Sequence, residues 1–117
     1  MEKISVVVPC YNEEKSLPFF YDEMKKVMKK MSNSEFELIF VNDGSKDKTL
    51  ELLEKIAEND KCVKIVSFSR NFGHQAAVTA GLQYVTGDAV VIMDADLQDP
   101  PELIPDMLKL WEEGNEV

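Results

Sequence analysis

The sequence predicts an α/β protein with three layers, α/β/α, whose middle layer is a parallel sheet of four or more strands in the order 3-2-1-4. Apolar, β-branched runs typical of strands buried on both faces alternate along the 117 residues with segments of helical period. This alternation implies right-handed crossovers, with helices on both faces of the sheet. Acidic and amide residues follow the strands directly, at the edge where open parallel sheets bind ligands, and we expect the site between the first and fourth strands.

Four strands are expected, over Ile4–Val8, Phe36–Val41, Val63–Phe68 and Ala89–Met93. We expect Pro9 to end the first of them, because proline has no N–H to donate to a ladder. A further strand is expected to begin at Glu116.

Four helices are expected between and after these strands, over Lys15–Met31, Asp47–Glu58, His74–Tyr84 and Pro101–Glu113. The first two place apolar residues at steps of three and four, as amphipathic helices do. The third is rich in small residues, which let a helix lie close to a sheet. The fourth is expected to be capped by Asp99, since proline is favoured in the first turn that follows a cap.

The formal charge of −9 argues against nucleic acid and against electrostatic attachment to anionic lipid. An anionic ligand would need a local positive centre, such as a metal, an arginine or a helix N-terminus. The apolar runs are too short to cross a membrane. Because Met1-Glu2-Lys3 leads directly into the first strand, we expect no signal peptide and expect the 117 residues to be soluble. Cys10 and Cys62 are expected to be reduced core residues.

Asp94-Ala95-Asp96 follows the fourth strand directly and is the strongest candidate for chemistry. Alternate residues leaving a strand can face one ligand, and two hard carboxylates suit Mg²⁺ or Mn²⁺. The alternative is that these acids are only loop residues and helix caps.

The other strands are also followed by unusual residues, in the stretches Pro9–Glu14, Asn42–Ser45 and Arg70–His74. None of these loops has the glycine spacing of a dinucleotide fingerprint or a phosphate-binding loop, and the sequence contains no recognisable serine triad. Paired carboxylates with a divalent cation point instead to a diphosphate ligand, which the metal would bridge to the protein.

Four stretches in order, VVVPCYNEE, FVNDGSKDKT, SRNFGHQAAVTAGL and MDADLQDPPE, resemble the motifs of family 2 glycosyltransferases with the GT-A fold. The resemblance covers essentially the whole chain and matches the first half of such an enzyme. The last two stretches are most similar to the polyprenyl-phosphate group, which includes bactoprenol glucosyltransferases and dolichol-phosphate mannosyltransferases.

The resemblance implies a role for each matching position. Asp94 and Asp96 would be the catalytic carboxylates, with Asp96 as the principal metal ligand, Gln98 completing its shell and Asp94 near the ribose and diphosphate. Asp43 would read the base. The remaining nucleotide-sugar contacts would come from Pro9, Tyr11, Asn12, Glu13 and Arg70.

Several of these residues also have simpler interpretations. Tyr11 could be a packed aromatic residue, and Glu13 could be a favourable charge at a helix N-terminus. Arg70 could form a surface salt bridge in place of a contact to donor phosphates. We expect His74 to be a residue of the first helical turn and not a catalyst.

The reaction implied by the resemblance is inverting transfer of a hexose from a nucleotide-diphosphate sugar, expected to be a UDP-sugar, to a polyprenyl phosphate, with Mg²⁺ or Mn²⁺. Residues 1–117 would form a single domain, the N-terminal nucleotide-sugar-binding part of a truncated catalytic domain, which binds nucleotide with little turnover. The full-length protein is expected at the cytoplasmic side of a membrane. The exposed sheet edge makes a homo-oligomer a further expectation.

Two other classes of protein share parts of this pattern. A sugar-1-phosphate nucleotidyltransferase also combines an α/β layout with metal carboxylates, but a glycine-rich basic loop would be expected after its first strand. A receiver-like module that binds metal or nucleotide without turnover would carry its acid pair after the first strand, where this chain has Asn12-Glu13-Glu14.

Overall fold

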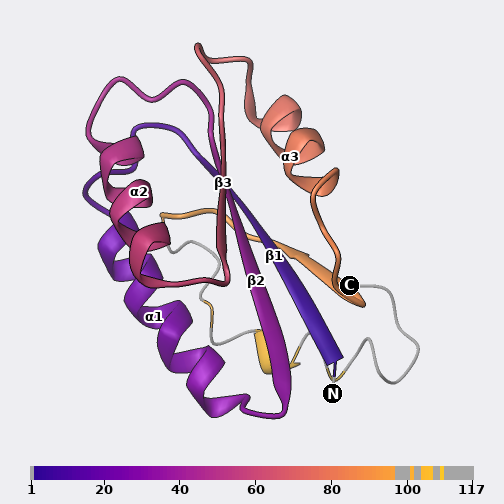
Figure 1. The fold of residues 1–117 in the computed structure, drawn as a ribbon. Coiled ribbons are helices and arrows are strands. Elements are labelled where there is room, and N and C mark those ends of the chain that lie inside the picture. The colour runs from indigo at the N-terminus through magenta and orange to yellow at the C-terminus, as the bar shows by residue number, and fades with distance from the viewer. Residues whose placement is uncertain (1, 97–100, 102–103, 107–108, 110–117) are drawn as a thin grey trace.

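The computed structural model describes residues 2–96, 101, 104–106 and 109. Its parallel sheet has the order β3-β2-β1-β4, which confirms the predicted strand order (Figure 1). The fourth predicted helix lies largely outside the described residues, as do Gln98, Asp99 and the strand expected from Glu116. The elements are β1 (Glu2–Cys10), α1 (Leu17–Lys30), β2 (Ser34–Asn42), α2 (Thr49–Asn59), β3 (Val63–Ser67), α3 (His74–Leu82) and β4 (Ala89–Ile92).

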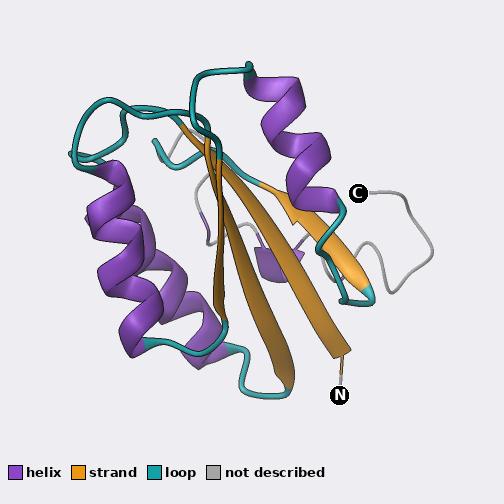
Figure 2. Cartoon of the chain, turned by 45° about the horizontal axis from the view of Figure 1, so that its top comes forward, coloured by secondary structure: helices purple, strands orange, loops and turns teal. Residues whose placement is uncertain are grey.

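The helices cover both faces of the sheet, as predicted (Figure 2). Helices α1 and α2 lie together on one face and α3 lies on the other. Successive side chains of β2 point to opposite faces of the sheet. Phe40 packs edge-on against Phe20 of α1, while Ile39 packs with Ala77 of α3. Both faces of the central strands are therefore mainly apolar, as expected for strands that are buried on both sides, and Ser5 and Glu37 are buried polar exceptions.

Pro9 does not end the first strand, contrary to the prediction, because β1 continues to Cys10. The carbonyl of Val7 accepts the N–H of Met93, just past the end of β4, whereas the carbonyl of Cys10 accepts the N–H of Asp43 at the end of β2. Successive residues of a strand direct their backbone N–H and C=O groups to opposite neighbouring strands, so the nitrogen of Pro9 points to the β4 side, like the backbone groups of Val7. The β1–β4 ladder ends at the Val7–Ile92 pair, so the donor that Pro9 lacks has no ladder position to fill.

The close packing of α3 follows from its small residues. A Cβ atom added to Gly81 would lie 2.5 Å from Cγ1 of Val7 and 3.1 Å from Cγ2 of Val41. The absence of a side chain at Gly81 thus lets α3 approach β1 and β2, which also brings its N-terminus over the carboxyl ends of the strands. Elsewhere the element boundaries differ from those predicted by about one or two residues. In the part of the chain that the structure describes, no helix combines the length and apolar character needed to cross a membrane.

Candidate functional site

The loops after β1, β2 and β3 gather at one end of the sheet, the upper end in Figure 1. There a pocket of about 430 Å³ opens between the carboxyl ends of β1 and β4 and the N-terminus of α3. This is the strand-order reversal at which open parallel sheets bind ligands. The pocket is lined by Pro9, Cys10, Tyr11, Glu13, Asp43, Asn71, Gly73, His74, Asp94 and Asp96.

The acid pair after β4 reaches this pocket as predicted. Ala95 is fully buried, whereas Asp94 is half-buried and Asp96 is exposed, and both aspartates line the pocket. The alternation of the strand thus continues past Ile92, with the small residue turned into the core and its two neighbours toward the pocket.

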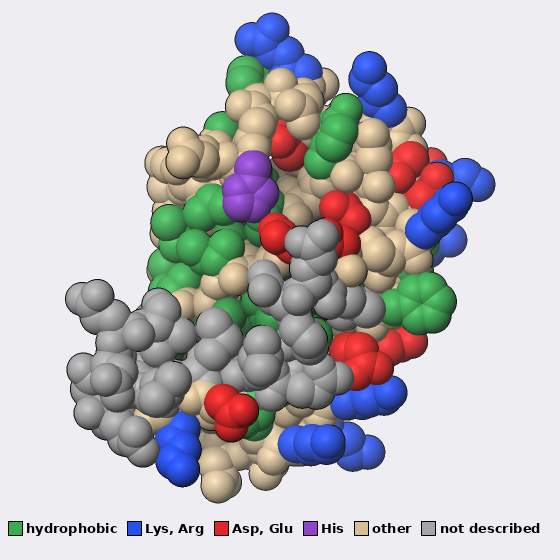
Figure 3. All heavy atoms as spheres, turned by 180° about the vertical axis from the view of Figure 1, so that it is seen from behind, with side chains coloured by type: hydrophobic (Ala, Val, Ile, Leu, Met, Phe, Trp, Pro, Cys, Tyr) green, Lys and Arg blue, Asp and Glu red, His purple; other side chains and the backbone are tan. Residues whose placement is uncertain are grey.

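His74 connects the acid pair to α3. It is the first residue of that helix, as expected, but its Nε2 also lies 3.2 Å from Oδ1 of Asp94. Figure 3 shows the histidine side chain beside a group of acidic side chains at this end of the molecule. The position of His74 at the start of a helix does not indicate a partner in the segment after β4, so this contact was not predicted.

Asp43 is buried at the end of β2, with 3 % of its surface exposed. Its carboxylate accepts the backbone N–H of Phe72 at 2.7 Å and that of Gly73 at 3.1 Å, and Nδ2 of Asn71 at 3.1 Å. The carboxylate thereby ties the end of β2 to the loop that precedes α3.

The loop after β1 is fastened to the loop after β2 through Asn12. Its backbone N–H donates to Oγ of Ser45 at 3.0 Å, and its Oδ1 accepts the N–H of Lys46 at 2.8 Å. Asn12 adopts a positive φ of 53°, a conformation that asparagine tolerates better than most residues. The amide of Asn12 therefore contacts the neighbouring loop, and Asn12 is not among the described residues that line the pocket.

Glu13 and Tyr11 both border the pocket. Oε2 of Glu13 accepts the hydroxyl of Ser16 at 2.8 Å, just before α1, while the Tyr11 side chain is 42 % exposed. The Tyr11 ring therefore lies on the pocket wall and does not fill the core.

Arg70 lies outside the described lining of the pocket, and its guanidinium stacks on the ring of Phe72 at 4.7 Å. Gln98 falls outside the described residues. The residues with a predicted role that the structure brings to the pocket are Pro9, Tyr11, Glu13, Asp43, Asp94 and Asp96. The lining also includes Cys10, Asn71, Gly73 and His74, which belong to the loops expected at this edge but had no binding role assigned to them.

Cys10 forms part of the pocket wall but is suited to packing and not to reaction. Its thiol is 2 % exposed and donates to the carbonyl of Val8. Burial, together with the negative charges of Glu13 and Asp94, raises the pKa of the Cys10 thiol. A neutral thiol is a poor nucleophile and a poor metal ligand.

The charge of the site is negative. The described lining contains four carboxylates and one histidine but neither lysine nor arginine. In the described part of the chain, no group of three or more His, Cys, Asp or Glu side chains is arranged to hold a metal. Two carboxylates nevertheless fit Mg²⁺ or Mn²⁺, since Mg²⁺ commonly takes one or two protein carboxylates and completes its shell with substrate phosphates and water.

A family model described as glycosyl transferase family 2 matches residues 5–117. The chain belongs to this family. Among curated relatives it is 54% identical over 113 residues to the uncharacterized glycosyltransferase YkcC of Bacillus subtilis and 46% identical over 112 residues to the bactoprenol glucosyl transferase of Shigella phage SfX. These alignments cover 97% and 96% of this chain but 35% and 36% of the relatives, so the chain spans about a third of their length.

Solved structures of similar fold include two complexes with nucleotide sugars. The mannosyltransferase PcManGT from Pyrobaculum calidifontis, in complex with GDP-Man and Mn²⁺, matches with a TM-score of 0.78 and 25% identity over 92% of this chain and 32% of its own. TarS 1–349 from S. aureus, in complex with UDP-GlcNAc, matches with a TM-score of 0.75 and 27% identity over 95% of this chain and 31% of its own. These likenesses agree with the GT-A fold expected from the sequence.

Proposed function

We propose that this chain is the nucleotide-sugar-binding part of an inverting glycosyltransferase, which transfers a hexose from a UDP-sugar to a polyprenyl phosphate with the help of Mg²⁺ or Mn²⁺. Family membership favours this function over a sugar-1-phosphate nucleotidyltransferase or a receiver-like module. The acceptor is a membrane lipid, so the full-length protein would act at the cytoplasmic side of a membrane.

The observation that carries the proposal is the acidic pocket at the strand-order reversal. A nucleotide diphosphate is itself an anion, and it would meet four carboxylates and neither lysine nor arginine in the described lining. A divalent cation held by Asp94 and Asp96 would turn this repulsion into attraction. Nucleotide binding should therefore depend on the metal.

The relatives support the finer parts of the proposal. A bactoprenol glucosyl transferase at 46% identity favours a polyprenyl phosphate acceptor and a hexose. The complexes of PcManGT with GDP-Man and Mn²⁺ and of TarS with UDP-GlcNAc favour a nucleotide-diphosphate sugar and a divalent metal. The choice of UDP over GDP follows the bactoprenol group of the sequence resemblance.

The residues on the two sides of the pocket would have different roles. Tyr11, Glu13 and Pro9 border the side of the pocket formed by β1, and we assign them to the nucleotide. Asp94 and Asp96 border the β4 side and would hold the metal, which supplies stabilisation of the leaving diphosphate.

The acceptor phosphate would attack the anomeric carbon as the bond from that carbon to the diphosphate breaks, which inverts its configuration. A phosphate monoester has a second pKa of about 6, so it is mostly dianionic at neutral pH. Such a nucleophile has little need of a general base. The proposed reaction therefore needs no general base among the carboxylates of the pocket, and Asp94 and Asp96 would serve the metal.

Calorimetric titration with UDP and with GDP, each with and without Mn²⁺, tests the proposal. We expect UDP to bind only with Mn²⁺, and Asp96→Ala to weaken that binding by about tenfold or more, as removal of a metal ligand does. Asp22→Ala is the matched control, because Asp22 is an exposed aspartate on α1, away from the pocket.

Each contrary result would remove a different part of the proposal. If neither nucleotide bound with Mn²⁺, the chain would not be a nucleotide-binding part. UDP binding that was unchanged in Asp96→Ala would remove the metal role of the acid pair. Tighter binding of GDP than of UDP would mean that the donor is a GDP-sugar, while the proposed class of reaction would stand.

A further inference from the structure

Three successive backbone N–H groups in the loop after β1 donate to side chains of residues 45–49, the segment that leads from β2 into α2. The bonds join Asn12 to Oγ of Ser45 at 3.0 Å, Glu13 to Oγ1 of Thr49 at 2.8 Å and Glu14 to Oδ2 of Asp47 at 3.2 Å. All three acceptors are side chains and none is a backbone carbonyl. The path of the 12–14 loop therefore depends on which residue types stand at these alternate positions of the 45–49 segment.

Thr49 is at the centre of this arrangement and is fully buried. Its hydroxyl accepts the N–H of Glu13 and donates its own proton to Oδ1 of Asp47, which also accepts the N–H of Thr49 at 3.0 Å. Burial alone would raise the pKa of Asp47, but hydrogen bonds from Thr49 and Glu14 outweigh it and lower the pKa. Asp47 is therefore a charged acceptor at neutral pH, and hydrogen bonds to a charged acceptor are stronger than neutral ones.

The loop held in this way carries the β1 side of the pocket wall. Tyr11 and Glu13 line the pocket, and the carbonyl of Glu13 accepts the N–H of Leu17, the first residue of α1, at 2.9 Å. Both backbone groups of Glu13 are thus bonded, one to the 45–49 segment and one to α1. The residues that hold the loop lie outside the described lining, and the sequence resemblance gave them no role: Ser45, Asp47 and Thr49.

We propose that Ser45, Asp47 and Thr49 are positioning residues, which hold the backbone of the 12–14 loop and thereby place the β1 side of the pocket for the nucleotide. This inference rests on the proposed function, since it takes the β1 side of the pocket to contact the nucleotide. It adds a second part to the site: the 45–49 segment acts on nucleotide affinity through the loop that it holds.

Two substitutions of Thr49 separate positioning from stability. Valine has the shape of threonine without the hydroxyl, so it leaves the N–H of Glu13 without its acceptor. Serine keeps the hydroxyl but removes a buried methyl group, so it also lowers stability. We expect Thr49→Val to weaken UDP binding, measured with Mn²⁺ by calorimetry, by about tenfold, and Thr49→Ser to stay within about twofold of the unmodified chain. If the chain binds GDP more tightly than UDP, the comparison is made with GDP.

Amide hydrogen exchange measured by NMR gives a readout that needs no ligand. In Thr49→Val the amide of Glu13 should exchange about tenfold faster, while that of Gly73, on the α3 side of the pocket, changes less. Thr86→Val is the matched control, because the Thr86 hydroxyl also donates to a carboxylate, that of Glu37, at 3.0 Å, and Thr86 lies outside the described lining of the pocket. This control should lower stability without a selective change at Glu13 and without loss of UDP affinity.

If Thr49→Val does not fold, Ser45→Ala tests the same arrangement from a less buried position, because it removes the acceptor of the Asn12 N–H. It should speed exchange at Asn12 and weaken UDP binding by about threefold.

Three results would overturn the inference: unchanged exchange at Glu13 in Thr49→Val, faster exchange there without loss of nucleotide affinity, or an affinity in Thr49→Ser as low as in Thr49→Val. Where Thr49→Val does not fold, unchanged exchange at Asn12 or unchanged affinity in Ser45→Ala has the same meaning. If the unmodified chain bound neither UDP nor GDP with Mn²⁺, the proposed function would fail. The exchange measurements would then still decide whether these side chains hold the loop.

Discussion

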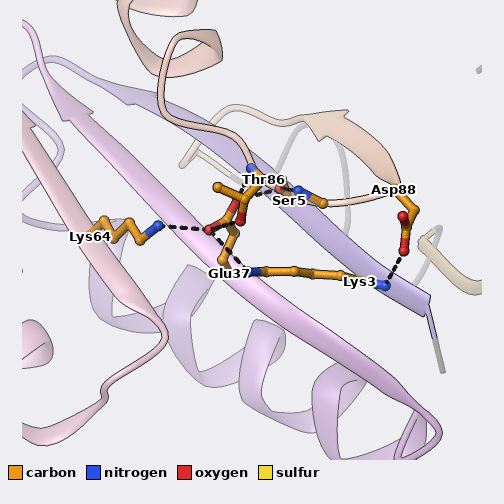
Figure 4. Close-up of polar contacts among 7 residues, drawn as sticks. Lys3, Ser5, Glu37, Lys64, Thr86 and Asp88 are labelled. Atoms are coloured by element: carbon orange, nitrogen blue, oxygen red, sulfur yellow. Dashed lines mark hydrogen bonds and ion pairs between the residues drawn. The ribbon is translucent and has the colours of Figure 1, made fainter.

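Oε1 of Glu37 accepts the backbone N–H of Thr86 at 2.6 Å, which fastens the turn before β4 to the middle of the sheet (Figure 4). Glu37 is a buried carboxylate on β2, with 3 % of its surface exposed. It also accepts the hydroxyls of Ser5 and Thr86 and pairs with Nζ of Lys64 at 2.9 Å. One side chain thus joins β1, β2, β3 and the segment that leads into β4.

Glu37→Gln should lower the free energy of unfolding by about 3 kcal/mol, because it removes a buried charge whose partners stay behind. The amide would also present a donor to the ammonium of Lys64. Urea unfolding followed by circular dichroism measures the change. Glu35→Gln is the control, since Glu35 is an exposed glutamate on the same strand, and a similar loss in both variants would contradict the role of Glu37.

The same carboxylate predicts a pH dependence of stability. Burial alone would raise the pKa of Glu37, but hydrogen bonds from Ser5, Thr86 and Lys64 outweigh it and lower the pKa from 4.5 to about 2. A carboxyl group with a lowered folded-state pKa stabilises the protein above its unfolded-state pKa, and this contribution is lost as pH falls toward the folded-state value. The stability difference between the unmodified chain and Glu37→Gln should therefore hold steady above about pH 5 and shrink between 4.5 and about 2.

Urea titrations of both proteins at several pH values would measure that difference directly. Comparing the two proteins cancels the contributions of other acids, such as Asp47 and Asp60. Burial raises the pKa of each of these two carboxyl groups, but hydrogen bonds outweigh it and lower the pKa. A difference that stayed constant down to pH 2 would show that Glu37 is not the group that titrates.

Gly81→Ala should destabilise the protein although alanine favours helices. The added methyl group would meet Val7 at 2.5 Å and Val41 at 3.1 Å, both within the buried face of the sheet. Overpacking of this kind costs about 1–3 kcal/mol, which exceeds the gain of about 1 kcal/mol in helix propensity. Thermal unfolding compared with Thr79→Ala, at an exposed position of the same helix, checks the expectation. A stabilised Gly81→Ala variant would mean that α3 can shift outward freely.

His74→Ala should weaken Mn²⁺-dependent binding of UDP by about threefold, because Asp94 loses the partner that holds its carboxylate in place. Calorimetry with Gln75→Ala as control isolates the effect, since Gln75 is the next, exposed residue of α3 and does not line the pocket between β1 and β4. Equal affinities in both variants would show that the contact between His74 and Asp94 has no part in binding.

The sequence was sufficient for the elements and their layers because these depend on patterns within single segments, and the sheet order expected from the alternation of strands and helices is confirmed. Apolar runs indicated the strands, and apolar residues at steps of three and four indicated α1. Gly81 and the nearby alanines indicated that α3 packs close to the sheet. Pro9 was the exception, since its effect depended on which neighbouring strand its nitrogen faces. The buried role of Glu37 was not predicted either, because its donors are distant in sequence. Ser5, Lys64 and Thr86 lie 32, 27 and 49 positions away.

The sequence predicted which loops form the site but not the hydrogen bonds that join one loop to another. Asp94 and Asp96 could be placed at the pocket because strand alternation is a local rule. Asn12 and Asp43 are different, since each lies in a loop whose side chains bond a second loop distant in sequence. A motif alone does not reveal whether such a polar side chain faces a ligand or another part of the same chain.

The pairing of β4 with β1 has a consequence for the order in which the protein folds. β1 and β2 are joined through residues such as Ser5 and Glu37, 32 positions apart, whereas the hydrogen bond from Lys3 to Asp88 spans 85 positions. Closing the longer loop costs more chain entropy, so we expect β4 to dock after the first three strands have assembled. Asp94 and Asp96 would then reach their positions last, and the same segment would be the first to leave when the fold opens.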